Sequence, residues 1–133
     1  MVVDSSVAVK WFVRDGEQGV EEAMALLEDH RARKRVLAAP SHLVLEVLNA
    51  LRWRGLAAGE LGGVARSLLG MRLELVPSQD LAVSAAELSV AHGLTVYDAA
   101  FAALALELDS ELVTADRRLA ESGACRAQLL GRA

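Results

Sequence analysis

Cysteine and aromatic residues are scarce in this sequence, and each shortage excludes a class of structure. The chain of 133 residues contains one cysteine, Cys125, which can form neither an internal disulfide nor a thiolate metal cluster. A lone cysteine fits a reducing compartment, and we expect Cys125 to be a small core or surface thiol. Aromatic residues make up 4% of the chain and hydrophobic residues 53%, so leucine, valine and alanine must build the core.

Long hydrophobic runs and a secretory leader are also missing. The most apolar segments, residues 43–51 and 99–106, are shorter than the roughly 20 residues that a membrane span requires. The N-terminus, Met-Val-Val-Asp, has no basic residues ahead of its apolar ones, as a signal peptide would have. We therefore expect a cytoplasmic protein that does not bind membranes.

An excess of positive charge is missing as well, because the formal net charge is −4. Proteins that bind nucleic acid through charge alone are usually basic. If this chain acts on a nucleic acid, it needs local arginines, bound cations, or both. The length fits a single domain over residues 1–133, with no internal repeat, linker or low-complexity segment.

Hydrophobic periodicity predicts short strands that alternate with helices. Apolar runs bounded by turn residues predict strands over residues 1–4, 36–39, 73–76, 111–114 and 127–130. Helical spacing predicts helices over residues 5–13, 20–30, 41–54, 59–71, 80–91 and 97–108, and a helical turn over 117–121. Ser41 is the expected N-cap of its helix. The alternation predicts the α/β class, with a central parallel sheet in a three-layer α/β/α domain.

Four carboxylates follow strands or lie on helices where an acid needs an explanation. Asp4 and Asp116 each follow a predicted strand, and either can simply cap the next helix. Asp98 lies in the first turn of a predicted helix, where the helix dipole favours an acid. Glu46 lies opposite the apolar stripe of its helix, where a solvated polar face is the ordinary interpretation.

Taken together, the four acids predict a metal site. Ligands bind outside the carboxyl ends of the strands in an open parallel sheet, so Asp4 and Asp116 should emerge at one edge, with Asp98 pointing into the same crevice. Two charges about 4 Å apart repel by about 4 kcal/mol at an effective dielectric of 20, so a fold would gather four carboxylates only around a cation. An all-oxygen set selects a hard ion, Mg²⁺ or Mn²⁺.

The same residues stand in four motifs that resemble those of the PIN-domain nucleases, in particular the VapC-type toxins. In the family order, these are VVDSSV at 2–7 with KWF at 10–12, EVLNAL at 46–51, LTVYDAA at 94–100, and LVTADRRL at 112–119. The resemblance covers residues 1 to about 122, and the tail after Gly123 matches nothing in the pattern.

The resemblance implies a compact PIN-like domain, Mg²⁺-dependent cleavage of RNA with Mn²⁺ as a substitute, homodimerisation, and inhibition by a cognate VapB-type antitoxin. It makes Asp4, Glu46, Asp98 and Asp116 the catalytic, metal-holding quartet. A bound ion can activate the attacking water and neutralise the developing charge, so no nucleophilic side chain is required.

Auxiliary roles follow for three polar residues beside the quartet. The resemblance makes Thr114 an orienting group for a water or an acid, and Asn49 a contact to an acid or to the substrate. Ser6 can hydrogen-bond Asp4 and fix its rotamer, or it is an ordinary helix-start serine.

Binding surfaces are also expected. Arg117 and Arg118, next to the last acid, are candidates for RNA binding, whereas the basic run at 31–35 is better explained as a solvated turn. Trp11 and Phe12 would normally be core residues, but the family resemblance also makes them candidates for antitoxin binding.

Other interpretations remain open. His42 and Glu46 are one turn apart, as in a metal-binding helix pair, but a zinc hydrolase needs three ligands and neither His30 nor His92 is an obvious third. A phosphatase-like nucleophile would want a second aspartate where Ser6 stands, and no glycine-rich phosphate loop is present. The alternative from a different class is a non-catalytic PIN-fold interaction or regulatory module, which the complete quartet disfavours.

Overall fold

The computed structural model describes residues 1–131 and contains a five-stranded sheet in which every pairing is parallel. The strand order is β3-β2-β1-β4-β5. The strands are β1 (Val2–Val3), β2 (Ala38–Pro40), β3 (Glu74–Val76), β4 (Leu112–Thr114) and β5 (Ala127–Leu129). The predicted α/β class is therefore confirmed, including the last strand, which lies at an edge.

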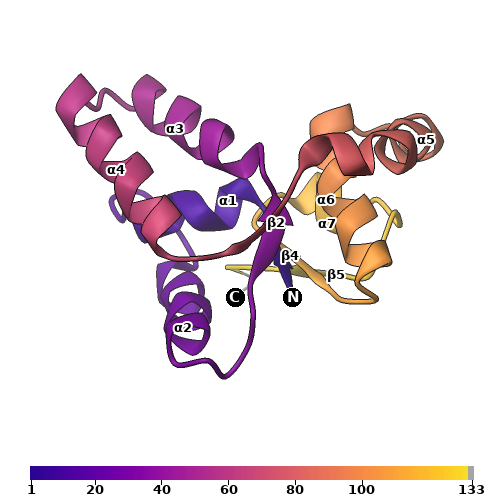
Figure 1. Ribbon diagram of the computed structural model, residues 1–133, viewed down its shortest axis with the longest axis horizontal. Helices are drawn as coiled ribbons and strands as arrows, with labels where there is room; N and C mark the ends of the chain where they lie inside the picture. Colours follow the sequence, from indigo (N-terminus) through magenta and orange to yellow (C-terminus); the bar gives the residue numbers. More distant parts are fainter. Residues whose placement is uncertain (132–133) are drawn as a thin grey trace.

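Helices cover both faces of this sheet (Figure 1). Figure 1 shows the helices of the first half of the chain on one side of the strands and those of the second half on the other. The helical segments are α1 (Ser5–Ala8), η1 (Val9–Trp11), α2 (Val20–Arg31), α3 (Leu43–Trp53), α4 (Ala58–Gly70), η2 (Ser78–Leu81), α5 (Ala82–His92), α6 (Val96–Glu107) and α7 (Arg117–Ala120). The predicted three-layer α/β/α arrangement is confirmed.

Two of the sequence-based expectations are wrong in detail. The helix predicted over 5–13 is a single α-helical turn followed by a 3₁₀ turn that ends at Trp11, whose indole N–H turns inward and donates to the Ala23 carbonyl at 2.8 Å. Ser41 does not cap α3, because His42 stands at the N-cap without a side-chain bond. The Ser41 hydroxyl instead accepts a hydrogen bond from the Ser78 amide at 3.1 Å, which links the ends of β2 and β3.

Helix α6 is the most buried of the long helices. Its residues from 99 to 105 are all buried, and it packs on β1, β2, β4 and α5. Five of those seven residues are alanines, whose small side chains let the helix lie close to the sheet and to its neighbours. Phe101 and Leu104 supply the bulk that fills the core there. This packing fixes the start of α6, where Asp98 lies.

No single helix within residues 1–131 is long and apolar enough to cross a membrane. The segments Ser78–His92 and Val96–Glu107 meet that requirement only as a pair, bent by 112° at the break between them.

The burial along α6 yields a matched pair of stability changes. Leu104 is fully buried, whereas Leu106 on the same helix is 52% exposed. We expect Leu104→Ala to lower the free energy of unfolding by about 2–5 kcal/mol and Leu106→Ala by about 0.5 kcal/mol or less. Chemical denaturation of both variants checks this, and equal losses would contradict the assigned position of α6.

Candidate active site

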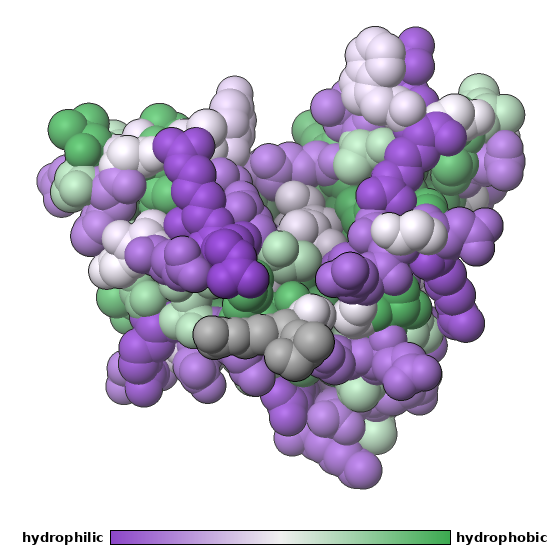
Figure 2. Space-filling view, turned by 180° about the vertical axis from the view of Figure 1, so that it is seen from behind, coloured by the Kyte–Doolittle hydropathy of each residue, from purple (hydrophilic) through white to green (hydrophobic). Residues whose placement is uncertain are grey.

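The site lies at the point where the strand order reverses. The chain runs from β1 outward to β3 and then returns to β4, on the other side of β1. Ligands bind in the crevice outside the carboxyl ends of the strands at such a switch point. Asp4 directly follows β1, and Asp116 lies two residues after β4, so both predicted acids emerge there. The space-filling view shows the molecule notched between two lobes of helices (Figure 2).

Asp4 is a buried carboxylate whose two oxygens are both held. It is 5% exposed; the Ser6 hydroxyl and the Val7 amide donate to Oδ1, and the Thr114 hydroxyl donates to Oδ2. Burial raises the pKa of Asp4 to about 6, helped by the charge of Asp98, although the three hydrogen bonds oppose this shift. The hydrogen bonds therefore fix the side chain in position, but its ionised form is still destabilised by burial.

Thr114 and Ser6 connect Asp4 to the segment that carries Asp116. Thr114 is fully buried, and its Oγ1 accepts a hydrogen bond from the Asp116 amide at 3.0 Å while donating to Asp4. The Ser6 Oγ accepts from the Ala115 amide at 2.9 Å. Both side chains thus contact Asp4, as the sequence predicts, and together they set the relative position of β1 and the turn after β4.

Asp98 interacts electrostatically with each of the other three acids. The Thr95 hydroxyl caps α6 by accepting from the Asp98 amide at 3.0 Å, so capping is done by another residue and the carboxylate is not needed for it. Burial raises the pKa of Asp98, and the charge of Asp116 adds to this, against the lowering effects of Thr95, Arg118 and His42. The charge of Asp98 in turn raises the pKa of Asp4 and of Glu46.

Glu46 projects from α3 with an oxygen that has no partner. Its Oε1 is buried and makes no hydrogen bond to any group within residues 1–131. The nearest cation-capable group, His42 Nε2, is 3.8 Å away, which is too far for a hydrogen bond. Burial and then the charge of Asp98 raise the pKa of Glu46, while a hydrogen bond from Ser5 lowers it.

His42 lies between Glu46 and α6 in a position typical of the neutral imidazole. Its Nε2 donates to the Tyr97 carbonyl at 3.2 Å, and its Nδ1 is 2.7 Å from the Ser78 hydroxyl. Burial lowers the pKa of His42, although the bond to Tyr97 and the charge of Asp98 act in the opposite direction. His42 thus joins the starts of α3 and α6 without supplying a full counter-charge to the acids.

Asp116 is exposed and caps the helix that follows it. Its Oδ1 accepts from the Arg118 amide at 2.9 Å and so caps α7. Asp4 likewise caps α1 by accepting from the Val7 amide. The ordinary interpretation of these two acids as helix caps is therefore confirmed, and it does not exclude a second role, since a cap leaves carboxylate oxygen capacity free.

Comparison with known proteins identifies the family. The PIN-domain family model matches residues 1–123. The chain belongs to the PIN-domain family. Its matched part contains all four acids, and members of this family are generally nucleases.

Several solved structures share this fold. Their sequence identities to this chain are low, so the similarity supports the fold alone. A toxin–antitoxin complex from Klebsiella pneumoniae aligns with a TM-score of 0.66 at 21% identity, over 93% of this chain and 93% of that one. PAE2754 from Pyrobaculum aerophilum gives 0.62 at 22% identity, over 95% and 88% of the two chains. FitAcB from Neisseria gonorrhoeae gives 0.61 at 17% identity, over 95% and 94%. No curated protein matches the sequence.

The four acids of this PIN domain are suitable ligands for a hard cation by the kind of atoms they offer, but they are not arranged as a complete metal site. The four acids offer only oxygen donors, and Glu46 Oε1 is buried without a partner. Yet no three His, Cys, Asp or Glu side chains within residues 1–131 lie close enough to form a metal-binding group. The carboxylates surround the site, and an ion would have to draw them together. No such group of histidine ligands supports the zinc alternative either.

The predicted contact residues occupy different surroundings. Asn49 is exposed on α3, one turn beyond Glu46. Arg117 is exposed and pairs with Glu121 at 3.2 Å, whereas Arg118 donates to the Gly93 carbonyl close enough to Asp98 to lower its pKa. Of the two arginines, Arg118 is therefore the one that lies beside the acids.

Trp11 and Phe12 are only partly open to an antitoxin, Phe12 more than Trp11. Trp11 is 8% exposed and belongs to the core, while Phe12 is partly buried against it. In the basic run at 31–35, Arg31 pairs with Glu28 and Arg35 with Asp29, which agrees with a solvated, internally paired turn.

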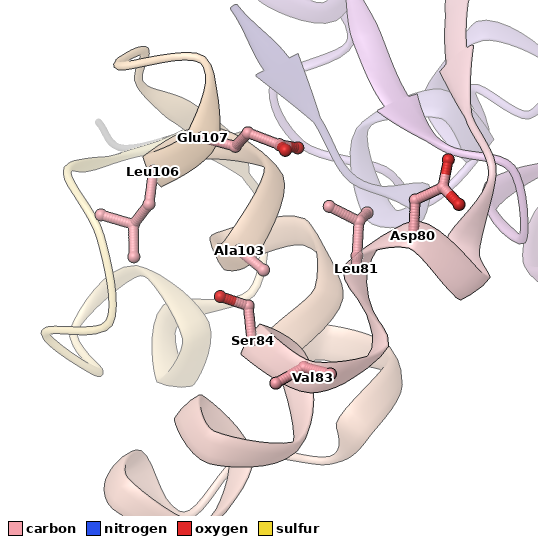
Figure 3. Close-up of a pocket in the computed structure, with 7 residues that line it drawn as sticks. All are labelled: Asp80, Leu81, Val83, Ser84, Ala103, Leu106 and Glu107. Atoms are coloured by element: carbon pink, nitrogen blue, oxygen red, sulfur yellow. The ribbon is translucent and has the colours of Figure 1, made fainter.

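A separate pocket of about 430 Å³ lies between η2, α5 and α6 (Figure 3). Figure 3 shows Leu81, Val83 and Ser84 on one wall and Ala103, Leu106 and Glu107 along α6. None of the four acids lines this pocket. It is therefore distinct from the candidate active site.

One group of charged residues beside the acids has no counterpart among the sequence predictions. Lys10, Glu17 and Arg54 form an ion-pair cluster that borders Ser5 and Ser6. The available signal was the position of Lys10 between Val9 and Trp11, where a charge interrupts an apolar segment. Glu17 follows Lys10 by seven residues across a turn, and Arg54 is 37 residues from Glu17, so no helix or strand spacing connects the three.

The raised pKa values of the acids predict how the metal-free protein responds to Asp98→Asn. A folded pKa above the unfolded value gives stability that is present at low pH and lost as pH rises through the folded pKa, about 6 for Asp4. Removing one charge should therefore leave the melting temperature equal or higher at about pH 8, with a smaller gain at about pH 5, where wild-type acids accept protons.

Thermal melts in EDTA at the two pH values measure this effect. Glu107→Gln, on the exposed end of the same helix, is the matched control and should change little at either pH. A clear loss of stability in Asp98→Asn at about pH 8 would indicate that the acid is structural.

Proposed function

We propose that this PIN domain is a metal-dependent endoribonuclease that acts as the toxin of a type II toxin–antitoxin module. The observation that carries the proposal is the arrangement of Asp4, Glu46, Asp98 and Asp116 around the switch point between β1 and β4. Three of them have raised pKa values, caused by burial and by their mutual charge. Perturbed acids that line a crevice are typical of catalytic sites.

The four acids would hold Mg²⁺, with Mn²⁺ as a substitute. When bound, the ion supplies a polarised water and neutralises charge at the phosphoryl oxygens. Asp4 is held by Ser6 and Thr114, so one carboxylate is already fixed before any ion or substrate arrives. That rigidity is the contribution of the protein, because ligands held in place by other residues need no reorganisation during the reaction.

Glu46 is the acid best placed to accept a proton. Its Oε1 has no hydrogen-bond partner among the described residues, and burial keeps its pKa above the usual range, closer to the pH at which proton transfer is useful. Arg118, beside Asp98, would contact a phosphate oxygen of the RNA. Asn49 would contact the substrate from the exposed face of α3, and Arg117 would add to the charge at the rim.

Cleavage of RNA by the purified chain tests the proposal. We expect Mg²⁺ or Mn²⁺ to be required, EDTA to abolish cleavage, and a zinc-selective chelator to leave it unchanged. Asp98→Asn should reduce the rate at least about 100-fold, because it removes a shared charge at the centre of the site. Glu107→Gln on the same helix should cleave like wild type.

The competing hypothesis, a non-catalytic PIN-fold module, predicts different results. It predicts no metal-dependent cleavage and no effect of Mg²⁺ on the wild-type melting temperature. Under the proposal, Mg²⁺ raises that temperature by mass action, and raises it less in Asp98→Asn. Sequencing of RNA ends after induced expression of wild type and Asp98→Asn would identify the cleaved RNA.

The toxin part of the proposal includes a cognate VapB-type antitoxin, a homodimer and a cytoplasmic location. It is supported by the motif resemblance and by the Klebsiella pneumoniae neighbour, a toxin–antitoxin complex. The antitoxin would cover apolar surface near Phe12 and the rim of Trp11, and it can place an arginine among the acids in place of the cation.

A charge placed on the proposed antitoxin surface tests that part. Phe12→Asp should weaken the complex at least about 10-fold, because it puts a carboxylate into an apolar contact. Val83→Asp, at an exposed apolar residue of α5, is the matched control and should leave the affinity unchanged. Calorimetry with the proposed cognate antitoxin measures both affinities. Equal affinities for Phe12→Asp and wild type would place the antitoxin elsewhere.

A further inference from the structure

A buried lysine beside the candidate active site is held in a three-residue ion-pair cluster. Lys10 Nζ lies 3.0 Å from Glu17 Oε2, and the Arg54 guanidinium binds the other oxygen, Oε1, of the same carboxylate. The side chain of Lys10 is 6% exposed and that of Arg54 is 40% exposed. Burial of Glu17 favours a higher pKa, but the hydrogen bonds and charges of the two cations outweigh this and lower it.

The cluster lines a pocket of about 380 Å³ that shares a wall with the acids. Besides the three charged residues, it is lined by two serines and three apolar residues: Ser5, Ser6, Val9, Ala50 and Ala115. The Ser6 Oγ donates to Asp4 Oδ1 and accepts from the Ala115 amide, so one layer of side chain separates this pocket from the buried aspartate. The pocket is therefore close enough to Asp4 for a chain bound at the acids to extend across it.

The charge of the cluster does not cancel. Lys10 and Arg54 bring two positive charges, and Glu17 brings one negative charge. Lysine has three N–H donors and arginine has five, whereas within residues 1–131 each side chain makes one hydrogen bond, to Glu17. Among the described residues, donors therefore remain for an anion. Serine hydroxyls, lysines and arginines are the usual contacts to nucleic-acid phosphates.

We propose that this pocket is a phosphate subsite, in which Lys10 and Arg54 bind the RNA backbone phosphate next to the one that is cleaved. The inference rests on the proposed ribonuclease function and names how its site holds the substrate. Glu17 holds the two cations at the pocket wall and limits their net charge. The subsite positions the RNA through its backbone, so its effect is independent of base sequence.

Binding of a labelled single-stranded RNA to the full chain tests this, with Asp98→Asn present throughout to prevent cleavage. Arg54→Gln should weaken binding about fivefold or more and reduce the slope of log Kd against log salt by about 0.7. Arg52→Gln is the matched control. It lies on the same helix, and its guanidinium stacks 4.6 Å from the Trp53 ring rather than facing the pocket.

Glu17→Gln separates a phosphate subsite from a purely structural ion pair. Under the proposal it removes the negative charge of the cluster and leaves both positive charges uncompensated, so RNA binding tightens and the salt slope increases, even if the melting temperature falls. A purely structural cluster predicts a lower melting temperature with binding unchanged or weaker, and that outcome would overturn the proposal. If Glu17→Gln does not fold, Arg54→Gln decides, since its side chain is partly exposed.

Steady-state cleavage with Asp98 intact distinguishes failure of this inference from failure of the proposed function. Arg54→Gln should raise KM more than it lowers kcat. A wild-type chain that cleaves RNA, together with an Arg54→Gln variant of unchanged affinity, salt slope and KM, would overturn the subsite alone. A wild-type chain that neither binds nor cleaves RNA would overturn both.

Discussion

The buried carboxylate of Asp4 is the constraint around which the rest of the site is organised. A charge removed from water between two strands needs several hydrogen bonds, and Ser6, Val7 and Thr114 supply them. Those bonds come from both sides of the β1–β4 pair. The requirement to satisfy one acid therefore also joins the two strands whose ends carry the acids, and it fixes the orientation of the turn that leads to Asp116.

Structural and catalytic uses of an acid are not alternatives in this fold. Asp4 and Asp116 each cap a short helix through one oxygen, and the cap holds the remaining oxygen capacity in a defined direction. Asp98 and Glu46 lack that support. The site thus combines two anchored acids with two less constrained ones, an arrangement in which a cation can complete the set by attracting the latter.

The sequence predicted the architecture well because the signals for it are local. The strands lie in short, largely apolar runs, and helices such as α3 bury residues at helical spacing, so their existence and order follow from neighbouring residues. The two errors at Ser41 and at the helix over 5–13 arise where distant groups decide. Ser78 competes for the Ser41 hydroxyl, and Ala23 draws the Trp11 indole inward.

The candidate site was predictable only in part, for a similar reason. The four acids stand in recognisable motifs, whereas the positions of His42 against Tyr97 and of Lys10 with Glu17 and Arg54 depend on tertiary packing. Spacing along the chain also does not reveal that Asp98 is the neighbour of each other acid. Electrostatic coupling is a property of the folded arrangement, and it appears only once the helices are placed.

Strand β5 shows that the family motif does not contain everything that shapes the site. The match to the PIN model ends at residue 123, yet β5 follows it and pairs in parallel with β4. Beyond that pairing, the Leu130 amide donates to the Thr114 carbonyl at 2.7 Å, on the residue whose hydroxyl holds Asp4. The part of the chain beyond the family match is thus hydrogen-bonded to a residue that holds one of the four acids. A substitution in that tail would therefore act on the position of Asp4 while every motif stays intact.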